Sequence, residues 1–308
     1  MKYAMALDIG GTRIKYMLVS STGNILLEAS ESTLPEGNPL PLSKRLEQIA
    51  GKMVDYAQIQ KLEIAGIGVG VPSIVEKGRI LFTNNLPELN NQVLEEAFSD
   101  LGLPVFIDND ANLMGLGEVT FGAGRGLSDS VFLTVGTGIG GAFFLNGRLY
   151  SGYRNRGAEP GHLIIQGKDG NPCSCGASGC LEAHASIGAL ITYYQQVLHE
   201  NKREIPLHID GKLIVARYRA QEKEARLAME EHFRSLSIGI ASLIHLFAPQ
   251  KVIVGGGISE SGAFYIQQLQ RRVQSLTMPE SARFTTLETA HLGNKAGCLG
   301  AAALVFNT

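Results

Sequence analysis

The sequence predicts an α/β protein made of two related units, each with a mixed sheet. The pattern of strand, glycine-rich turn and strand occurs at residues 3–20 and again at 130–145, which indicates a duplicated unit. Elsewhere, short apolar runs alternate with segments of helical period. Because a single hydrophobic core stops growing at roughly 250–300 residues, the length of 308 residues favours two domains with a cleft between them.

The first half is expected to begin as an antiparallel meander and to continue as alternating helices and strands. Leu42, Leu46, Ile49 and Met53 recur at helical spacing, whereas the strands are short and rich in β-branched residues. The predicted elements are strands over 3–9, 13–20 and 24–31, a helix over 42–60, a strand over 63–70, a helix over 91–101, a strand over 104–108 and a helix from 110 to 121.

The second half repeats the meander and then becomes mostly helical. Asn146-Gly147 is typical of a tight hairpin turn. The predicted elements are strands over 130–135 and 142–145, a loop-rich stretch over 150–182, helices over 185–200 and 211–248, a strand over 251–254 and helices over 262–275 and 295–306. We expect one domain to comprise 1–119 with the helix at about 293–308, and the other to comprise 120–292.

The charge balance argues against nucleic acid or a membrane surface as a partner. Lys and Arg total 27 against 29 Asp and Glu, for a net charge of -2, and like charges are not clustered. Asp8 interrupts the N-terminus before a signal-peptide core of about 7–15 apolar residues can form. The longest apolar stretch, 238–247, is too short for the ~18–20 residues of a spanning helix. We therefore expect a cytoplasmic protein.

Glycines are in excess and clustered, which marks places where the backbone approaches something closely. The chain has 37 glycines, where average usage of roughly 7% would give about 22. The Gly10-Gly11 turn between two strands can offer free N–H groups to phosphate oxygens. Asp8 could hold Mg²⁺ through water, and Lys15 could neutralise phosphate charge. A plain hairpin is the alternative, but a second such turn at 136–141 favours phosphate binding.

The second turn contains a formal G-x-G-x-x-G over 136–141. A dinucleotide-binding fingerprint must open a helix, whereas 142–145 reads as a strand followed by a hairpin turn. The sequence also lacks the G-x-x-x-x-G-K-[ST] pattern of a P-loop. If this protein handles ATP, it does so by neither of these motifs.

Three of the four cysteines lie within eight residues, as Cys173, Cys175 and Cys180, and His162 precedes them. In a cytosolic chain such thiols indicate a metal site more often than a disulfide. Three thiolates and an imidazole form a closed tetrahedral zinc site without room for a catalytic water, so the zinc would be structural. The alternative, small core residues, is disfavoured by the surrounding Pro and Gly. Cys298 stands alone and is expected to be a buried structural thiol.

Asp110 lies at a strand-to-helix junction, where α/β proteins place chemistry. A helix cap and a catalytic base are equally good readings of this residue. In phosphoryl transfer an ordinary Asp suffices as base, because the loose transition state needs positioning more than basicity. Asn109 adds a nearby polar group, whereas Glu159 and Glu182 are ordinary solvated charges unless the zinc loop points them into the cleft.

These motifs together resemble those of the ROK family of bacterial sugar kinases and sugar-responsive repressors, which has the actin/hexokinase ATPase fold. The resemblance runs from about residue 3 to 306. Its most specific parts are Asp8-Ile9-Gly10-Gly11-Thr12, Asn109-Asp110-Ala111-Asn112, the turn over 136–141, Glu159-Pro160-Gly161-His162, and Cys173-x-Cys175-Gly176-x-x-Gly179-Cys180-x-Glu182.

The resemblance implies a role for each position of these motifs. The first phosphate loop and its Mg²⁺ would involve Asp8, Gly10, Gly11, Thr12 and Lys15. The second phosphate loop would be Gly136, Thr137 and Gly138, with Gly256 and Gly257 beside the adenosine of ATP. Sugar hydroxyls would bind Asn109, Glu159, His162 and Glu182, and Asp110 would take the proton of the sugar 6-hydroxyl. Zinc would bind His162, Cys173, Cys175 and Cys180.

The leading functional prediction is an ATP-dependent hexose kinase that resembles a glucokinase. N-acetylglucosamine, N-acetylmannosamine or fructose are alternative substrates of the same class. A sugar-sensing transcriptional regulator would need a DNA-binding domain, for which we expect no room before Asp8, and a non-catalytic sugar-binding module is disfavoured by the intact Asp110 and phosphate loops. The family tendency predicts a homo-oligomer, a dimer or a tetramer.

Overall fold

The computed structural model describes residues 1–34, 40–83 and 86–307, and the chain forms two compact units. Unit 1 comprises 1–126, 149–157 and 294–308, and unit 2 comprises 127–148 and 158–293. These ranges differ from the expected 1–119 and 120–292 in two places. Helix α2 (Asp110–Phe121) continues past residue 119, and the segment 149–157 belongs to unit 1.

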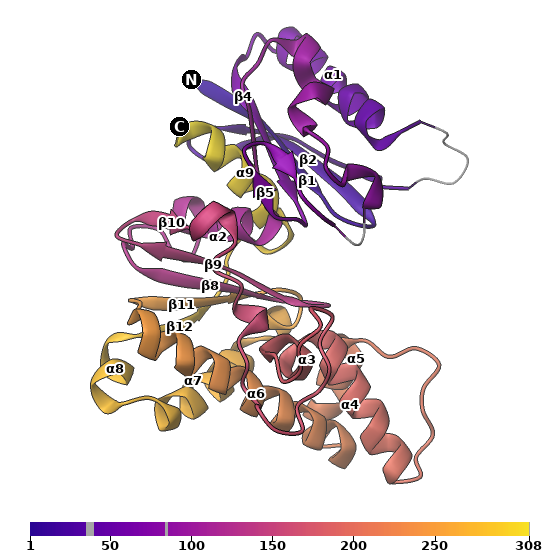
Figure 1. The fold of residues 1–308 in the computed structure, drawn as a ribbon, viewed down its shortest axis with the longest axis vertical. Helices are drawn as coiled ribbons and strands as arrows, with labels where there is room; N and C mark the ends of the chain where they lie inside the picture. Colours follow the sequence, from indigo (N-terminus) through magenta and orange to yellow (C-terminus); the bar gives the residue numbers. More distant parts are fainter. Residues whose placement is uncertain (35–39, 84–85, 308) are drawn as a thin grey trace. The chain divides into compact units, whose positions relative to one another are not determined.

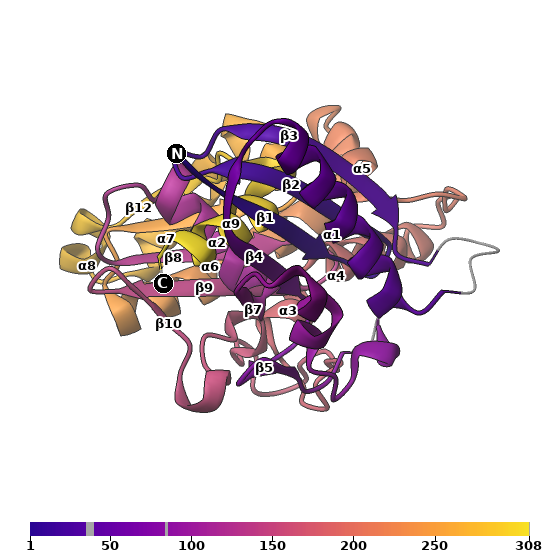
Figure 2. The same cartoon turned by 90° about the horizontal axis from the view of Figure 1, so that it is seen from above.

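Unit 1 contains a five-stranded mixed sheet in the order β3-β2-β1-β4-β7, which can be followed in Figure 2. The strands are β1 (Lys2–Ile9), β2 (Arg13–Ser20), β3 (Ile25–Ser32), β4 (Glu63–Val71) and β7 (Val105–Asn109). The first three pair antiparallel, and β4 and β7 are added in parallel. The predicted meander and the mixed sheet are confirmed.

The two faces of this sheet carry side chains of different size. Along β4, Ile67, Val69 and Val71 are fully buried in the cluster that includes helix α1 (Leu42–Ile59). The alternate residues are glycines: Gly66 and Gly68 lie against helix α9 (Ala296–Phe306), and Gly70 lies against Leu113 of α2. A Cβ at Gly68 would lie 1.9 Å from the Ala301 carbonyl oxygen. The glycine cluster of β4 therefore lets a helix pack directly on the strand backbone; Figure 1 shows α1 and α9 on opposite sides of the sheet.

Helix α2 packs against α9 with the same closeness. A Cβ at Gly300 of α9 would lie 1.7 Å from the Leu113 carbonyl oxygen of α2, and one at Gly117 would lie 2.6 Å from the Ala296 carbonyl oxygen. Only glycine permits this approach. The two helices therefore form one layer against the sheet.

Unit 1 is completed by short elements, and here one prediction is wrong. They are β5 (Val75–Glu76), β6 (Arg79–Ile80) and the 3-10 helices η1 (Pro87–Leu89), η2 (Leu94–Leu101) and η3 (Tyr153–Asn155). The helix predicted over 91–101 is a 3-10 helix that begins at Leu94. Asn91 has a φ of 62° and Val93 is extended, so a helix cannot run through them.

Unit 2 repeats the sheet of unit 1, strand for strand. The strands of this second sheet are β8 (Ser130–Val135), β9 (Ile139–Leu145), β10 (Arg148–Tyr150), β11 (Lys251–Gly255) and β12 (Thr286–Thr289), in the order β10-β9-β8-β11-β12. The chain boundary between the units falls within β10. Antiparallel β8–β9 and parallel β8–β11–β12 correspond to β1–β2 and β1–β4–β7. The predicted duplication holds at the level of topology, although β12 was not predicted.

Helices cover one face of this second sheet (Figure 1). They are α3 (Leu181–Ala185), α4 (Ile187–Glu200), α5 (Gly211–Arg219), α6 (Lys223–Phe247), α7 (Ala263–Leu276) and α8 (Pro279–Phe284), and unit 2 also has the 3-10 helices η4 (Pro160–His162) and η5 (Ser259–Ser261). The 3-10 helix η6 (Gly293–Lys295) spans the chain boundary between unit 2 and unit 1 and leads into α9. Of the described helices, none combines the length and apolar content that crossing a membrane requires.

The single helix predicted over 211–248 is wrong, because α5 and α6 are separate. Gln221 between them has a φ of 62°, which breaks the helical path. The break is held by Tyr194, whose hydroxyl donates to Glu222 Oε1 at 2.5 Å and accepts from Arg217 at 2.7 Å. The helix predicted over 185–200 begins instead at Ile187, because Ser186 caps it by accepting a hydrogen bond from the Ala189 N–H.

Candidate active site

The first glycine turn, Gly10 to Thr12, joins β1 to β2. Asp8 and Lys15 are direct cross-strand partners beside it, and Lys15 Nζ lies 3.7 Å from Asp8 Oδ2. Burial raises the pKa of the Asp8 carboxyl, and the Lys15 charge partly lowers it. The turn thus lies beside one carboxylate and one ammonium, the groups predicted for Mg²⁺ and phosphate.

Thr33 holds this turn in place, a role that the sequence analysis missed. Its hydroxyl donates to the Gly10 carbonyl at 2.7 Å, and its N–H donates to the Thr12 carbonyl at 2.9 Å. Arg45 of α1, itself buried, donates to the carbonyls of Ser32 and Thr33. A buried guanidinium therefore fixes the segment that supports the turn.

The strand register aligns two carboxylates at the same end of the sheet. Asp8 pairs with Gly70, and Gly70 pairs with Asp108. Because neighbouring strands lie about 4.8 Å apart, the Cα atoms of the two aspartates are about 10 Å apart, with a glycine between them. Burial raises the pKa of Asp108, although Asn112 Nδ2 and the Asn109 N–H donate to its carboxylate and lower it. Asp108 was not among the predicted site residues.

Asn109, rather than Asp110, caps helix α2. Asn109 Oδ1 accepts from the N–H groups of Ala111 at 2.9 Å and Asn112 at 3.1 Å, and its Nδ2 donates to the Ser73 carbonyl. Asp110 is the first helical residue, and its Oδ1 accepts from the Ala111 N–H at 2.8 Å. The helix dipole stabilises a carboxylate at this position. The N-cap of this helix is therefore Asn109 and not Asp110.

The second glycine turn borders a cavity within unit 2. Gly136, Thr137 and Gly257, all predicted nucleotide ligands, line this cavity of 270 Å³. The sequence analysis missed its other lining residues, which are Ile187, Asp210, Gly211, Lys212, Ile258 and Ser261. They come from the starts of α4 and α5 and from the segment after β11, which only the fold brings together.

Gly256 brings the end of β11 against the end of β8. It has a φ of +91°, and a Cβ there would lie 2.2 Å from the Val135 carbonyl oxygen. Its own carbonyl accepts from the Ser259 N–H and hydroxyl. Its role is therefore to let the chain turn beside the cavity, and Gly257 lies in the cavity wall.

The predicted sugar ligands of unit 2 lie close to one another. Glu182 Oε2 accepts from the Ile139 N–H at 2.9 Å, and its Oε1 accepts from the Ser174 hydroxyl at 3.3 Å. Burial raises the pKa of Glu159; the His162 ring opposes this shift, and the Glu182 charge adds to it. Glu159, His162 and Glu182 therefore form one polar cluster.

The predicted zinc ligands also converge. The donor atoms of His162, Cys173, Cys175 and Cys180 all lie within 4.8 Å of one another. Cys173 Sγ lies 3.7 Å from His162 Nδ1, and Cys175 Sγ lies 3.7 Å from Cys180 Sγ. A tetrahedron with Zn–S bonds of about 2.3 Å has edges of about 3.8 Å. The donor set fits zinc, and it uses His162 Nδ1, which leaves the Nε2 side of the ring for another partner.

Comparison with known proteins identifies the family. The profile of the ROK family matches residues 4–308. The chain belongs to the ROK family. The glucokinase of Thermotoga maritima is 33% identical over 98% of this chain and 96% of its own length. The crystal structure of a ROK hexokinase from Thermus thermophilus has a TM-score of 0.84 at 30% identity, covering 99% of this chain and 98% of that one.

Two further ROK proteins bear on function. A ROK glucokinase from Streptomyces griseus, solved in complex with glucose and AMPPNP, has a TM-score of 0.81 at 30% identity and covers 99% of this chain and all 100% of its own. The xylose repressor of Caldicellulosiruptor bescii is 29% identical over 98% of this chain, which spans 78% of that repressor. The predicted ROK resemblance and the α/β fold of the ROK hexokinases are confirmed.

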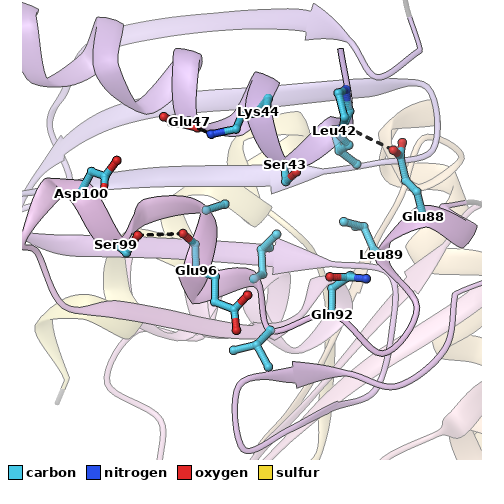
Figure 3. A pocket seen from close by; sticks show the side chains of 14 residues that line it. Leu42, Ser43, Lys44, Glu47, Glu88, Leu89, Gln92, Glu96, Ser99 and Asp100 are labelled. Atoms are coloured by element: carbon cyan, nitrogen blue, oxygen red, sulfur yellow. Dashed lines mark hydrogen bonds and ion pairs between the residues drawn. The ribbon is translucent and has the colours of Figure 1, made fainter. Parts of the chain in front are cut away.

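This ROK protein has a further pocket in unit 1, shown in Figure 3, with a volume of 430 Å³. Helix α1 begins after Pro41, whose side chain cannot cap it, and Glu88 Oε2 accepts from the Leu42 N–H at 3.2 Å instead. Lys44 forms an ion pair with Glu47 at 2.7 Å. None of the predicted site residues lines this pocket. Its contacts stabilise the start of α1.

Proposed function

We propose that this chain is an ATP-dependent sugar kinase that transfers the γ-phosphoryl group of ATP to the 6-hydroxyl of glucose or a related hexose. The observation that carries the proposal is that the motifs of ROK kinases are intact and folded: two glycine turns in duplicated sheets, and Asp110 at the start of α2. The S. griseus glucokinase, with glucose and AMPPNP bound, supports both substrates.

Asp110 acts as the base in this proposal. Its carboxylate accepts the proton of the 6-hydroxyl while the hydroxyl oxygen attacks the γ-phosphorus, and the bond from that phosphorus to the bridging oxygen breaks to release ADP. Such a transition state needs positioning and charge stabilisation more than a strong base. Because Asn109 takes the capping role, Asp110 is positioned by the helix start without being its N-cap.

The phosphates are proposed to bind the two glycine turns. In unit 1, the N–H groups of Gly10 to Thr12 and the Lys15 ammonium would contact phosphate oxygens. Asp8 offers the hard oxygen ligand that Mg²⁺ prefers, directly or through water. When bound, Mg²⁺ neutralises charge on the β- and γ-phosphates. In unit 2, the cavity beside Gly136, Thr137 and Gly257 is proposed to receive the adenosine.

The polar cluster of unit 2 is proposed to bind the sugar. Glu159, His162 and Glu182 would hydrogen-bond hydroxyls, the role that the family resemblance also implies for Asn109. The cysteines and His162 Nδ1 would hold a structural zinc ion, which supplies no catalytic water because its four positions are taken. The zinc thus fixes the loop that carries the sugar ligands. A dimer or tetramer stays a prediction, to be measured by light scattering.

The test is an ADP-release assay across a panel of glucose, mannose, fructose, N-acetylglucosamine and N-acetylmannosamine. We expect hexose-dependent ADP release, with kcat/KM highest for glucose. Asp110→Asn keeps an oxygen for the Ala111 N–H but loses the base, so its kcat should fall by about 10²–10⁴. Asp100→Asn, an exposed residue at the end of η2, is the matched control and should act as the wild type.

Two results would reject the proposal. Sugar binding without any ADP release, measured by calorimetry and the coupled assay together, would favour the sugar-responsive regulators of the family or a non-catalytic sugar-binding module. Full activity of Asp110→Asn would remove Asp110 from its role as base. A preference for an N-acetylhexosamine or fructose would change the substrate but leave the activity class in place.

A further inference from the structure

We infer that Glu182 positions the second phosphate turn and thereby couples the zinc loop to nucleotide binding. This inference rests on the proposed kinase function and adds to it. The family resemblance implies only that Glu182 contacts the sugar. Its contacts, however, point to the nucleotide side of unit 2 as well.

The first argument is the hydrogen bond to Ile139. Glu182 Oε2 accepts from the Ile139 N–H at 2.9 Å. That N–H belongs to the same planar peptide as the Gly138 carbonyl, and the Gly138 oxygen accepts from the Gly136 N–H at 2.9 Å. The peptide that closes the glycine turn is therefore held at both ends, by Gly136 on one side and by Glu182 on the other.

The second argument is the close packing of Glu182 on the turn. A Cβ at Gly138 would lie 2.4 Å from Glu182 Oε2, and the three nearest atoms to that position all belong to Glu182. Gly138 has no left-handed φ, so an alanine there is strained by the carboxylate and not by its backbone. An alanine Cβ at Gly138 would therefore displace the Glu182 carboxylate from the place where it accepts from the Ile139 N–H.

The third argument is that the zinc loop holds the same carboxylate. Glu182 Oε1 accepts from the Ser174 hydroxyl at 3.3 Å, and Ser174 lies between the zinc ligands Cys173 and Cys175. Cys180, another ligand, is the residue before helix α3, whose first turn contains Glu182. The zinc loop therefore holds Glu182 in two ways: Cys180 lies two residues before it in the chain, and Ser174 donates a hydrogen bond to its carboxylate.

The consequence is that the shape of the turn depends on the zinc loop. Gly136 and Thr137 line the 270 Å³ cavity of unit 2, and the Gly136 carbonyl accepts from the Ile187 N–H at 2.8 Å. A loose zinc loop frees Glu182, and the turn then loses the hydrogen bond between the Ile139 N–H and Glu182 Oε2. Nucleotide affinity should fall even when no sugar is present.

The experiment is a double-mutant cycle read out by the Kd for a fluorescent ADP analogue, measured without sugar. Loss of one hydrogen bond to a charged group should weaken binding on the order of tenfold in Glu182→Ala. Glu182→Gln keeps an oxygen acceptor for Ile139 and should bind the analogue within about threefold of the wild type, so a pure charge effect is separated from positioning. Gly138→Ala should weaken binding in the wild type but much less in the Glu182→Ala background, because the clash is then absent.

The zinc arm uses the wild type after zinc is removed by a chelator and Mg²⁺ is restored. We expect weaker binding of the ADP analogue, a smaller effect of zinc removal in Glu182→Ala, and an intermediate loss in Ser174→Ala, whose fold should be unaffected by so small a change at an exposed residue. Thermal unfolding checks that each variant is folded.

Three outcomes would overturn the inference. They are an unchanged Kd in folded Glu182→Ala, additive effects in the cycle, or unchanged nucleotide affinity after complete zinc removal. If the wild type binds and uses nucleotide normally while the variants bind it equally well, only this inference fails. If the wild type binds no nucleotide at all, the proposed function fails first.

Discussion

The close contact between α9 and α2 predicts that replacing one helical glycine with alanine will destabilise the protein. In an exposed helix, Gly→Ala stabilises by about 0.5–1 kcal/mol, because glycine loses more conformational freedom on folding. At Gly300, however, the new Cβ would lie 1.7 Å from the Leu113 carbonyl oxygen and 2.4 Å from its carbon. These atoms are backbone, so no side chain can rotate away.

The clash must therefore be relieved by moving a helix. Overpacking of this kind costs about 1–3 kcal/mol, which exceeds the helix-propensity gain of about 1 kcal/mol. We expect Gly300→Ala to lower the free energy of unfolding, and the melting temperature by roughly 2–4 °C for each kcal/mol lost. Because Gly297 of α9 lies directly against the Asp8 carboxylate, the displaced helix should lower kinase activity too.

Gly51→Ala in α1 is the matched control. Among the described residues no atom lies within 4 Å of a Cβ at Gly51, so this variant should be slightly more stable than the wild type. Urea unfolding of the two variants, followed by circular dichroism, measures both effects. If Gly300→Ala is as stable as Gly51→Ala, the packing of α9 on α2 is not as close as described.

Three further predictions follow from the sites. Thr33→Val removes the hydroxyl that donates to the Gly10 carbonyl; it should lower the free energy of unfolding in urea by about 1–3 kcal/mol and raise the KM for ATP. Thr33→Ser keeps the donor and should change neither quantity. Burial raises the pKa of Asp108 in the folded state above its ordinary value of 3.8, so near pH 4 the folded chain binds more protons at this residue than the unfolded chain does. The free energy of unfolding of the wild type, relative to that of Asp108→Asn, should therefore fall as the pH rises from about 4 through the raised pKa. A difference between the two proteins that does not change with pH would contradict this. Cys175→Ser should lose its bound zinc, measured by elemental analysis, and should have a lower melting temperature, whereas Cys298→Ser in α9 should keep the zinc. Freshly purified wild type that contains no zinc would reject the proposed zinc site.

The sequence predicted the strands well because their signals are local. Period-2 alternation and the glycine turns identify β1, β2, β8 and β9, and the strand after the second turn correctly excluded a dinucleotide fingerprint. The helix boundaries at Gln221 and Asn91 were missed, because a left-handed residue without glycine or proline leaves no local signal.

The candidate site was predicted only where a motif was dense. The cysteines with His162 form one motif and each glycine turn forms another, and the residues within each motif are close enough in sequence to be recognised. Thr33 and Asp108 act through strand pairing and hydrogen bonds between distant segments. The cavity residues at 210–212 join Gly136 only through the fold. Their residue types are ordinary, so no spacing rule identifies them.

The place of α9 has a consequence for how the protein is made. Unit 1 contains the first glycine turn, yet helix α9, which packs on β4 and Asp8, belongs to residues 294–308, which the ribosome adds only after all of unit 2. Until α9 has been synthesised, Gly66 and Gly68 of β4 lack the helix that packs on them. During synthesis unit 2 can close its core first, an order opposite to that of the chain.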